Sequence, residues 1–227
     1  MRKVLVIGSN GLVGKGVSDF FENTENVQLT KVDMCENFDL RDKQSIKKYL
    51  KSKSDIEYIV NCSGINDHVD ENDSLDSTKT DLDNMDLFFD INVKSVCRII
   101  EYSKEYLNNL KGVINFASLY GIRSPFHPIY DKPKSLSYTV SKHALEGITK
   151  YYAALYGKNG ITINAIRIGG IEANQSKRFK DWFTSRTPLG RMANLKDLYG
   201  TINLLCSEDG SYITGQSITL DGGYTSW

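Results

Sequence analysis

The chain has 227 residues, of which 28 are Lys or Arg and 28 are Asp or Glu, so the formal net charge is zero. A protein without net positive charge has no overall electrostatic attraction to nucleic acid or to an anionic membrane surface. The four cysteines are scattered without paired spacing or a histidine cluster, and no apolar run reaches ~18 residues. These features exclude a disulfide framework, a zinc site and a membrane span, so we expect a soluble cytoplasmic protein without a metal.

Short apolar runs alternate with amphipathic stretches along the chain, an order typical of a parallel sheet covered by helices. Strands are expected at residues 3–7, 27–32, 57–61, 112–116, 162–168 and 217–220. Helices are expected at residues 14–22, 42–51, 85–110, 138–156 and 195–207. Several strand runs are continuously rich in Val and Ile, which indicates burial on both faces. The sequence thus predicts an α/β fold, a single doubly wound Rossmann domain over residues 1–227, with about seven parallel strands and helices on both faces.

The first expected strand runs into a glycine-rich turn at residues 8–14, Gly-Ser-Asn-Gly-Leu-Val-Gly. Glycines at this spacing allow a tight turn, close backbone approach to a pyrophosphate and close packing of the next helix. That helix directs its first N–H groups at the phosphates. Asp33 follows the second strand, where its carboxylate suits both ribose hydroxyls and repels a 2′-phosphate. We expect NAD as the cofactor, with NADP left open.

Two further polar turns lie near the same edge of the predicted sheet, one before the second helix and one after the third strand. Both are expected to form walls around the adenine and its ribose. The residues expected to contact the dinucleotide are Gly8, Asn10, Gly11, Leu12, Val13, Asp33, Asp39, Leu40, Asn61, Cys62, Ser63 and Gly64.

A tyrosine and a lysine four residues apart, Tyr138 and Lys142, begin the fourth expected helix and share one of its faces. The ammonium is expected to favour the phenolate and lower the pKa of the tyrosine from its usual value of about 10. Ser118 follows the fourth strand and offers a hydroxyl to a substrate oxygen. Tyr130 and Lys134 repeat the spacing, but Pro133 between them disfavours a helix there. We therefore take Tyr138 as the acid–base group.

These motifs, in this order, resemble the short-chain dehydrogenase/reductase family from about residue 3 to the C-terminus. Asn-Cys-Ser-Gly at 61–64 is a variant of the family's Asn-Asn-Ala-Gly, and the tail at 188–191, 211–216 and 221–223 is similar to the single-domain branch. The resemblance implies that Tyr138 is the general acid–base, Lys142 its pKa modulator and ribose ligand, and Ser118 the donor to the substrate oxygen. It also implies that Asn92 holds a water relay. The cofactor contacts then include Tyr138, Lys142, Gly169 and Ile171.

The chain departs from the family pattern at three places. Its glycine spacing is that of the sugar-nucleotide epimerase branch, and Ile168 stands where the family has a proline. Ser118 and Tyr138 are 20 residues apart, more than is usual, which indicates a longer substrate loop at about 119–137. Residues 169–175 also resemble the branch linked to bacterial surface-sugar and flagellin modification.

A second segment expected at the substrate is a lid at about residues 172–191, which holds five basic and two acidic side chains. Arg178 and Arg186 lie about two helical turns apart if this lid is helical, and arginine forks suit phosphate or carboxylate. We therefore expect Arg178, Arg186 and Ser118 to contact a substrate with an anionic group. An alternative is a solvated lid whose charges serve only solubility.

The function predicted from these features is NAD(H)-dependent interconversion of a secondary alcohol and a ketone by hydride transfer, on a sugar-like or nucleotide-linked anionic small molecule. The family resemblance implies a homodimer or homotetramer, and neither nucleic acid nor a membrane is an expected partner. Two alternatives stay open: a sugar-nucleotide epimerase or dehydratase, suggested by the glycine spacing, and a non-catalytic dinucleotide-binding protein.

Overall fold

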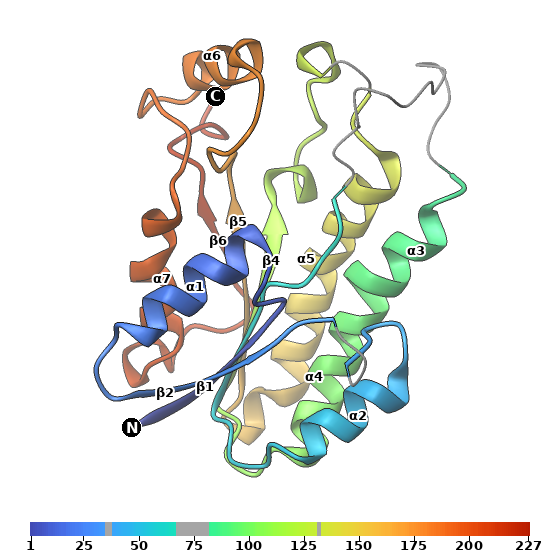
Figure 1. Ribbon diagram of the computed structural model, residues 1–227, viewed down its shortest axis with the longest axis vertical. Coiled ribbons are helices and arrows are strands. Elements are labelled where there is room, and N and C mark those ends of the chain that lie inside the picture. The colour runs from blue at the N-terminus through green and yellow to red at the C-terminus, as the bar shows by residue number, and fades with distance from the viewer. Residues whose placement is uncertain (35–37, 67–81, 131–132) are drawn as a thin grey trace.

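The computed structural model describes residues 1–34, 38–66, 82–130 and 133–227, and these form a parallel sheet with helices on both faces (Figure 1). The six strands of the described residues lie in the order β2-β1-β3-β4-β5-β6, and every pairing is parallel. The strands are β1 (Arg2–Ile7), β2 (Val27–Val32), β3 (Tyr58–Asn61), β4 (Gly112–Ser118), β5 (Thr162–Ile168) and β6 (Ser217–Leu220). The predicted doubly wound α/β fold is therefore confirmed.

Helices cover the sheet in two layers, with α1 and α7 on one face and α2, α4 and α5 on the other (Figure 1). The α-helices are α1 (Leu12–Glu22), α2 (Lys43–Lys51), α3 (Met85–Phe89), α4 (Ser95–Tyr106), α5 (Leu136–Tyr156), α6 (Lys177–Arg186) and α7 (Tyr199–Leu205). A π-helical turn, η1 (Asp90–Lys94), joins α3 to α4. The short 3₁₀ segments are η2 (Leu119–Gly121), η3 (His127–Ile129), η4 (Gly157–Asn159), η5 (Leu195–Leu198) and η6 (Glu208–Gly210).

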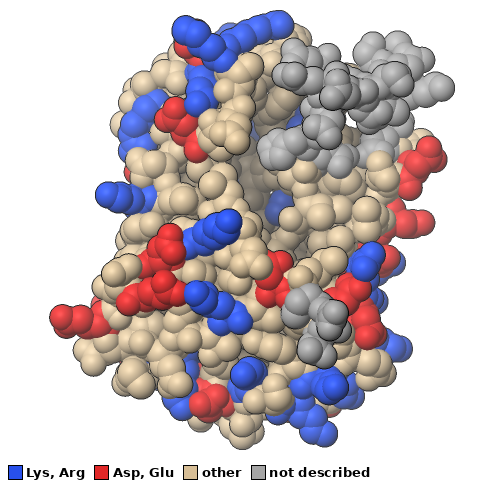
Figure 2. Space-filling model, viewed as in Figure 1, with Lys and Arg blue, Asp and Glu red and all other residues tan. Residues whose placement is uncertain are grey.

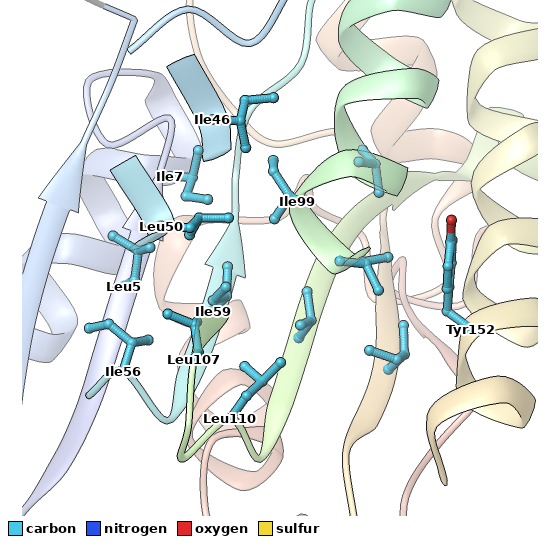
Figure 3. Packing of buried hydrophobic residues seen from close by; sticks show 14 of the residues in the cluster. Leu5, Ile7, Ile46, Leu50, Ile56, Ile59, Ile99, Leu107, Leu110 and Tyr152 are labelled. Atoms are coloured by element: carbon cyan, nitrogen blue, oxygen red, sulfur yellow. The ribbon is translucent and has the colours of Figure 1, made fainter. Parts of the chain in front are cut away.

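Each face of the sheet has its own apolar core, because the inner strands bury side chains on both sides. Figure 3 shows one of these cores, in which Leu5 and Ile59 of the sheet face Ile46 and Leu50 of α2 and Ile99 of α4. On the opposite face, Val17 and Phe21 of α1 and residues of α7 pack against the other side of the same strands. Removing this apolar surface from water stabilises the sheet and the helices packed on it.

The structure differs from the expected elements in three respects. Among the described residues six strands form where about seven were expected, with β2 at the sheet edge and α2 the next element along the chain. The helix expected at 85–110 is three successive helical segments that end at Tyr106. The helix expected at 195–207 begins as the 3₁₀ turn η5. Among the described residues, no helix is long and apolar enough to cross a membrane.

Candidate active site

The carboxyl ends of the parallel strands meet at one edge of the sheet, beneath α6 (Figure 1). In an open parallel sheet this edge is where ligands bind. Figure 2 shows a hollow in the surface between the α6 side of the molecule and the α3–α5 side, with basic atoms visible inside it. The residues singled out from the sequence lie around this edge.

The glycine turn after β1 has the close backbone contacts that a phosphate-binding turn needs. Gly8 has φ +78°, and a Cβ there would lie 2.7 Å from the backbone nitrogen of Ser63. At Gly14 a Cβ would lie 1.9 Å from the Gly8 carbonyl oxygen, so α1 packs against the turn at a distance that only glycine allows. No side chain caps the N-terminus of α1, which begins after Gly11. Its first N–H groups therefore suit a pyrophosphate, and the turn fits a dinucleotide.

Asp33 follows β2 and reaches across to the glycine turn. One carboxylate oxygen accepts the Asn10 backbone N–H at 2.6 Å, and the other accepts the Met34 backbone N–H at 2.6 Å. These contacts fix the carboxylate beside the N-terminus of α1, where the hydroxyls of an adenosine ribose would lie.

The two polar turns expected beside the adenine and its ribose, at residues 39–40 and 61–64, are stabilised by different contacts. Asp39 is paired with Arg41, and this side-chain hydrogen bond holds the pKa of Asp39 below its usual value, while Leu40 is buried. On the other wall, Asn61 is buried and accepts the Ser63 hydroxyl at 2.5 Å. Cys62 lies between them in the sequence, directly after the end of β3.

Ser118, Tyr138 and Lys142 come together at the end of β4 and in the first turns of α5. The Lys142 ammonium lies 5.7 Å from the centroid of the Tyr138 ring and donates to the Phe116 carbonyl oxygen at 2.7 Å. Ser118 makes a side-chain hydrogen bond with Tyr138. All three side chains are nearly inaccessible to solvent. Tyr138 and Lys142 share one face of α5, and Ser118 ends the neighbouring strand β4. A phenol, an ammonium and a hydroxyl therefore lie close together.

The electrostatics of Tyr138 differ from the expectation drawn from the sequence. Burial raises the pKa of Tyr138 above its usual value, and the hydrogen bond from Ser118 only partly opposes this. Burial also lowers the pKa of Lys142 to about 8. The expected lowering of the tyrosine pKa is therefore wrong for this structure, because the cost of desolvating the phenolate exceeds the opposing effect of the Ser118 hydrogen bond.

Asn92 lies in the π-helical turn η1 and clamps the segment after β3 to α5. Its side-chain oxygen accepts the Ile65 backbone N–H at 2.9 Å. Its amide donates to the Ile65 carbonyl at 3.0 Å and to the Ser141 hydroxyl at 3.0 Å. Gly64 passes so close that a Cβ there would lie 3.2 Å from the Asn92 side-chain oxygen. The side chain thus fixes the backbone that lies next to Lys142.

The expected lid is helical at α6, and it packs on the substrate loop. Trp182 stacks on Phe126 of the loop at 4.9 Å between ring centroids, with an interplanar angle of 2°. The Arg178 guanidinium donates to the Pro128 carbonyl at 3.1 Å, whereas the Arg186 guanidinium lies over the Trp182 ring at 5.8 Å. Two residues of the expected loop at 119–137, 131 and 132, lie outside the described residues.

Sequence reasoning missed Lys134. Tyr130 is not helical, as Pro133 predicted, and its hydroxyl pairs with that of Tyr120. Lys134, however, is only 8% exposed, and its ammonium lies 4.7 Å from the centroid of the Tyr138 ring. The signal available in the sequence was its position four residues before Tyr138, immediately ahead of the helix.

Residues after β5 complete the edge. Gly169 lies close to Asp221, where a Cβ would be 3.1 Å from the Asp221 Cα, and Ile171 pairs with Ala193 in an isolated parallel bridge. Ile168 pairs with Leu220 of β6. A cavity of about 470 Å³ lies between these residues and the lid, lined by Gly169 and by Phe183 among others. Neither Ser118 nor Tyr138 lines this cavity.

Comparisons with known proteins agree with this geometry. A family model described as enoyl-(acyl carrier protein) reductase matches residues 17–225. The chain is 27% identical to 3-oxoacyl-(acyl-carrier-protein) reductase FabG of Thermotoga maritima over 187 residues, which cover 80% of this chain and 71% of the relative. It is 33% identical to glucose 1-dehydrogenase of Gluconobacter oxydans over 146 residues, 60% of this chain and 52% of the relative. A short-chain dehydrogenase of Leptospira borgpetersenii, solved with bound NAD⁺, matches 99% of this chain and 92% of its own with a TM-score of 0.81 and 27% identity.

Proposed function

This chain belongs to the short-chain dehydrogenase/reductase family of oxidoreductases, and we propose that it uses NAD(H) to interconvert a secondary alcohol and a ketone on a sugar-like substrate with an anionic group. The observation that carries the proposal is the meeting of Ser118, Tyr138 and Lys142 at the edge that also holds the glycine turn and Asp33.

In the reductive direction Tyr138 gives its phenolic proton to the substrate oxygen, and in oxidation it takes that proton back. Ser118 holds the same oxygen through its hydroxyl. Because burial raises the pKa of Tyr138, the phenol is protonated at neutral pH and ready to act as the acid. Lys142 supplies a nearby positive charge that offsets part of the cost of the phenolate. A bound nicotinamide supplies or accepts the hydride.

The choice of NAD(H) follows from Asp33. The turn at Gly8–Gly14 and the uncapped start of α1 would hold the pyrophosphate, and the Asp33 carboxylate would accept the ribose hydroxyls. A 2′-phosphate would meet that carboxylate with like charge. The NAD⁺-bound relative from Leptospira borgpetersenii supports the same choice.

The substrate class rests on the lid and on one relative. Arg178 and Arg186 provide guanidinium groups near the substrate loop, and arginine suits carboxylate and phosphate groups. The similarity to a glucose 1-dehydrogenase supports a polyol or sugar. Substrates of this kind have the secondary alcohol that the proposed acid–base chemistry requires.

A turnover screen tests the proposal. The purified protein is incubated with NAD⁺ and a panel of sugars, sugar acids and nucleotide sugars, and NADH formation is followed at its absorbance band. Reduction of a substrate's carbonyl with NADH is the matched reverse assay. We expect turnover with an anionic member of the panel and strongly reduced turnover in Tyr138→Phe. Product analysis of the nucleotide-sugar reactions separates oxidation from epimerisation, and binding of NADH without any turnover would favour a non-catalytic protein.

A homo-oligomer is expected to form on the long helices. Tyr151 and Leu155 of α5 are 64% and 51% exposed, which leaves an apolar face on the outside of the described structure. Light scattering coupled to gel filtration would show a dimer or tetramer, and a monomer at micromolar concentration would contradict the expectation.

A further inference from the structure

Lys134 lies beside the tyrosine that the proposed function makes the acid–base group. It lies two residues before the start of α5 at Leu136, outside the helix that holds Lys142. Its ammonium is 4.7 Å from the centroid of the Tyr138 ring, compared with 5.7 Å for the Lys142 ammonium. Both distances are within the range of a cation–π contact. Lysine is seldom this well buried, and here the buried ammonium lies against the ring of Tyr138.

Contacts from separate segments hold Lys134 in place. Its ammonium donates to the side-chain oxygen of Asn66, which directly follows Ile65, the residue clamped by Asn92. Its backbone N–H donates to Nδ1 of His127 in the substrate loop at 3.2 Å. The next residue, Ser135, caps α5 by accepting the Tyr138 backbone N–H at 3.1 Å. The lysine is thus fixed relative to Tyr138 by the β3 end, the loop and the helix start together.

We propose that Lys134 is a positioning residue for Tyr138, whose ammonium holds the phenol ring and favours the phenolate, so that two lysines set the pH at which Tyr138 exchanges its proton. This rests on the proposed function, in which Tyr138 carries that proton. An opposite charge within about 4–6 Å favours the ionised form of a group and shifts its titration by about one pH unit or more. Lys134 would therefore offset part of the cost of burying the phenolate.

The other groups around Tyr138 carry little charge near neutral pH. From the loop come Tyr120 and Tyr130, whose hydroxyls bond to each other and whose pKa values are raised by burial, that of Tyr120 to about 12. From α3 comes the apolar ring of Phe88, 6.5 Å away between centroids. Ser118 comes from β4. Within the described part of the chain, Lys134 and Lys142 are therefore the cations that face Tyr138.

The test measures the titration of residue 138 itself, so it needs neither substrate nor cofactor. Tyr138 is replaced by 3,5-difluorotyrosine, whose fluorines acidify the phenol and bring its titration into a range where the protein is folded. Its ¹⁹F resonance then reports one site among 13 tyrosines. We expect the titration midpoint to rise by about one pH unit in Lys134→Met. It should stay close to the wild-type value in Lys134→Arg, which keeps the charge.

Lys150→Met, at an exposed lysine of the same helix, is the matched control and should leave the midpoint unchanged. If Lys134→Met does not fold, as judged by circular dichroism, Asn66→Asp gives a second test. It keeps the lysine but pairs its ammonium with a carboxylate, and it should also raise the midpoint. An unchanged midpoint in the folded variant, or equal shifts in Lys134→Met and Lys134→Arg, would overturn the proposal. Failure of the proposed function would show separately, as absence of NADH binding or turnover in the wild-type protein.

Discussion

Replacing Asp33 by asparagine tests the basis of cofactor choice directly. The carboxylate is held by the Asn10 and Met34 backbone N–H groups, each at 2.6 Å, so it cannot easily turn away from an added 2′-phosphate. Lys31, the basic residue two positions before Asp33, is paired with Glu22 at 2.5 Å. We therefore expect the site to favour a ribose without a 2′-phosphate.

The size of the effect follows from the charges. Two like unit charges about 4 Å apart repel by about 1 kcal/mol in water and about 4 kcal/mol near a protein surface. Asp33 is partly exposed, so we take about 2 kcal/mol, which corresponds to about 30-fold in Kd. Wild-type protein should therefore bind NADPH about 30-fold more weakly than NADH. In Asp33→Asn the two values should come within a few-fold of each other, because the amide removes the repulsion.

Fluorescence titration with both cofactors measures this difference. Asp19→Asn, at an exposed carboxylate farther along α1, is the matched control and should keep the wild-type preference. Added salt should reduce the difference in Kd between NADPH and NADH in the wild type, because salt partly screens the repulsion. Equal or tighter binding of NADPH by the wild-type protein would refute the reasoning.

Three further predictions concern the catalytic residues and the lid. Tyr138→Phe should lower turnover by roughly 10²–10⁴-fold while NADH still binds, whereas Tyr130→Phe should change turnover little. Steady-state rates of both variants measure this, and an inactive Tyr130→Phe variant would mean that the acid–base group was assigned to the wrong tyrosine. Arg178→Ala or Arg186→Ala should raise KM for the anionic substrate, less so for a neutral analogue or in added salt, and an unaltered KM in both variants would leave the solvated-lid interpretation. Burial lowers the pKa of Lys142 to about 8, so below pH 8 the charged lysine destabilises the folded protein. This destabilisation decreases as the pH rises from about 8 to about 10.4, the pKa of a lysine in the unfolded chain. In urea unfolding, the free energy of unfolding of the wild type should increase by on the order of 3 kcal/mol relative to that of Lys142→Met between pH 7 and 10.5. A difference in unfolding free energy that does not change with pH would contradict the burial of the Lys142 ammonium.

The sequence by itself determined the elements and the motifs. Buried strands such as β5 are continuous apolar runs, and the glycine turn and the Tyr138–Lys142 pair are set by residues only a few positions apart. Neighbouring residues fix local backbone geometry and the face that a side chain occupies, so these features follow from spacing. That is why the strand positions and the Tyr138–Lys142 pair could be predicted from spacing, whereas the place of Ser118 beside them, 20 residues before Tyr138, was implied by the family resemblance.

Only the tertiary structure decided the electrostatics of the site. Burial by distant segments raises the pKa of Tyr138, against the sequence-based expectation. The packed fold also brings Lys134 against the same ring, although Pro133 had argued against a role for the Tyr130–Lys134 pair. The π-helical turn at Asn92 likewise depends on its hydrogen bonds to Ile65 and Ser141, 27 and 49 residues away. Desolvation and charge pairing are properties of the whole packed molecule, because they depend on which remote groups exclude water from a side chain.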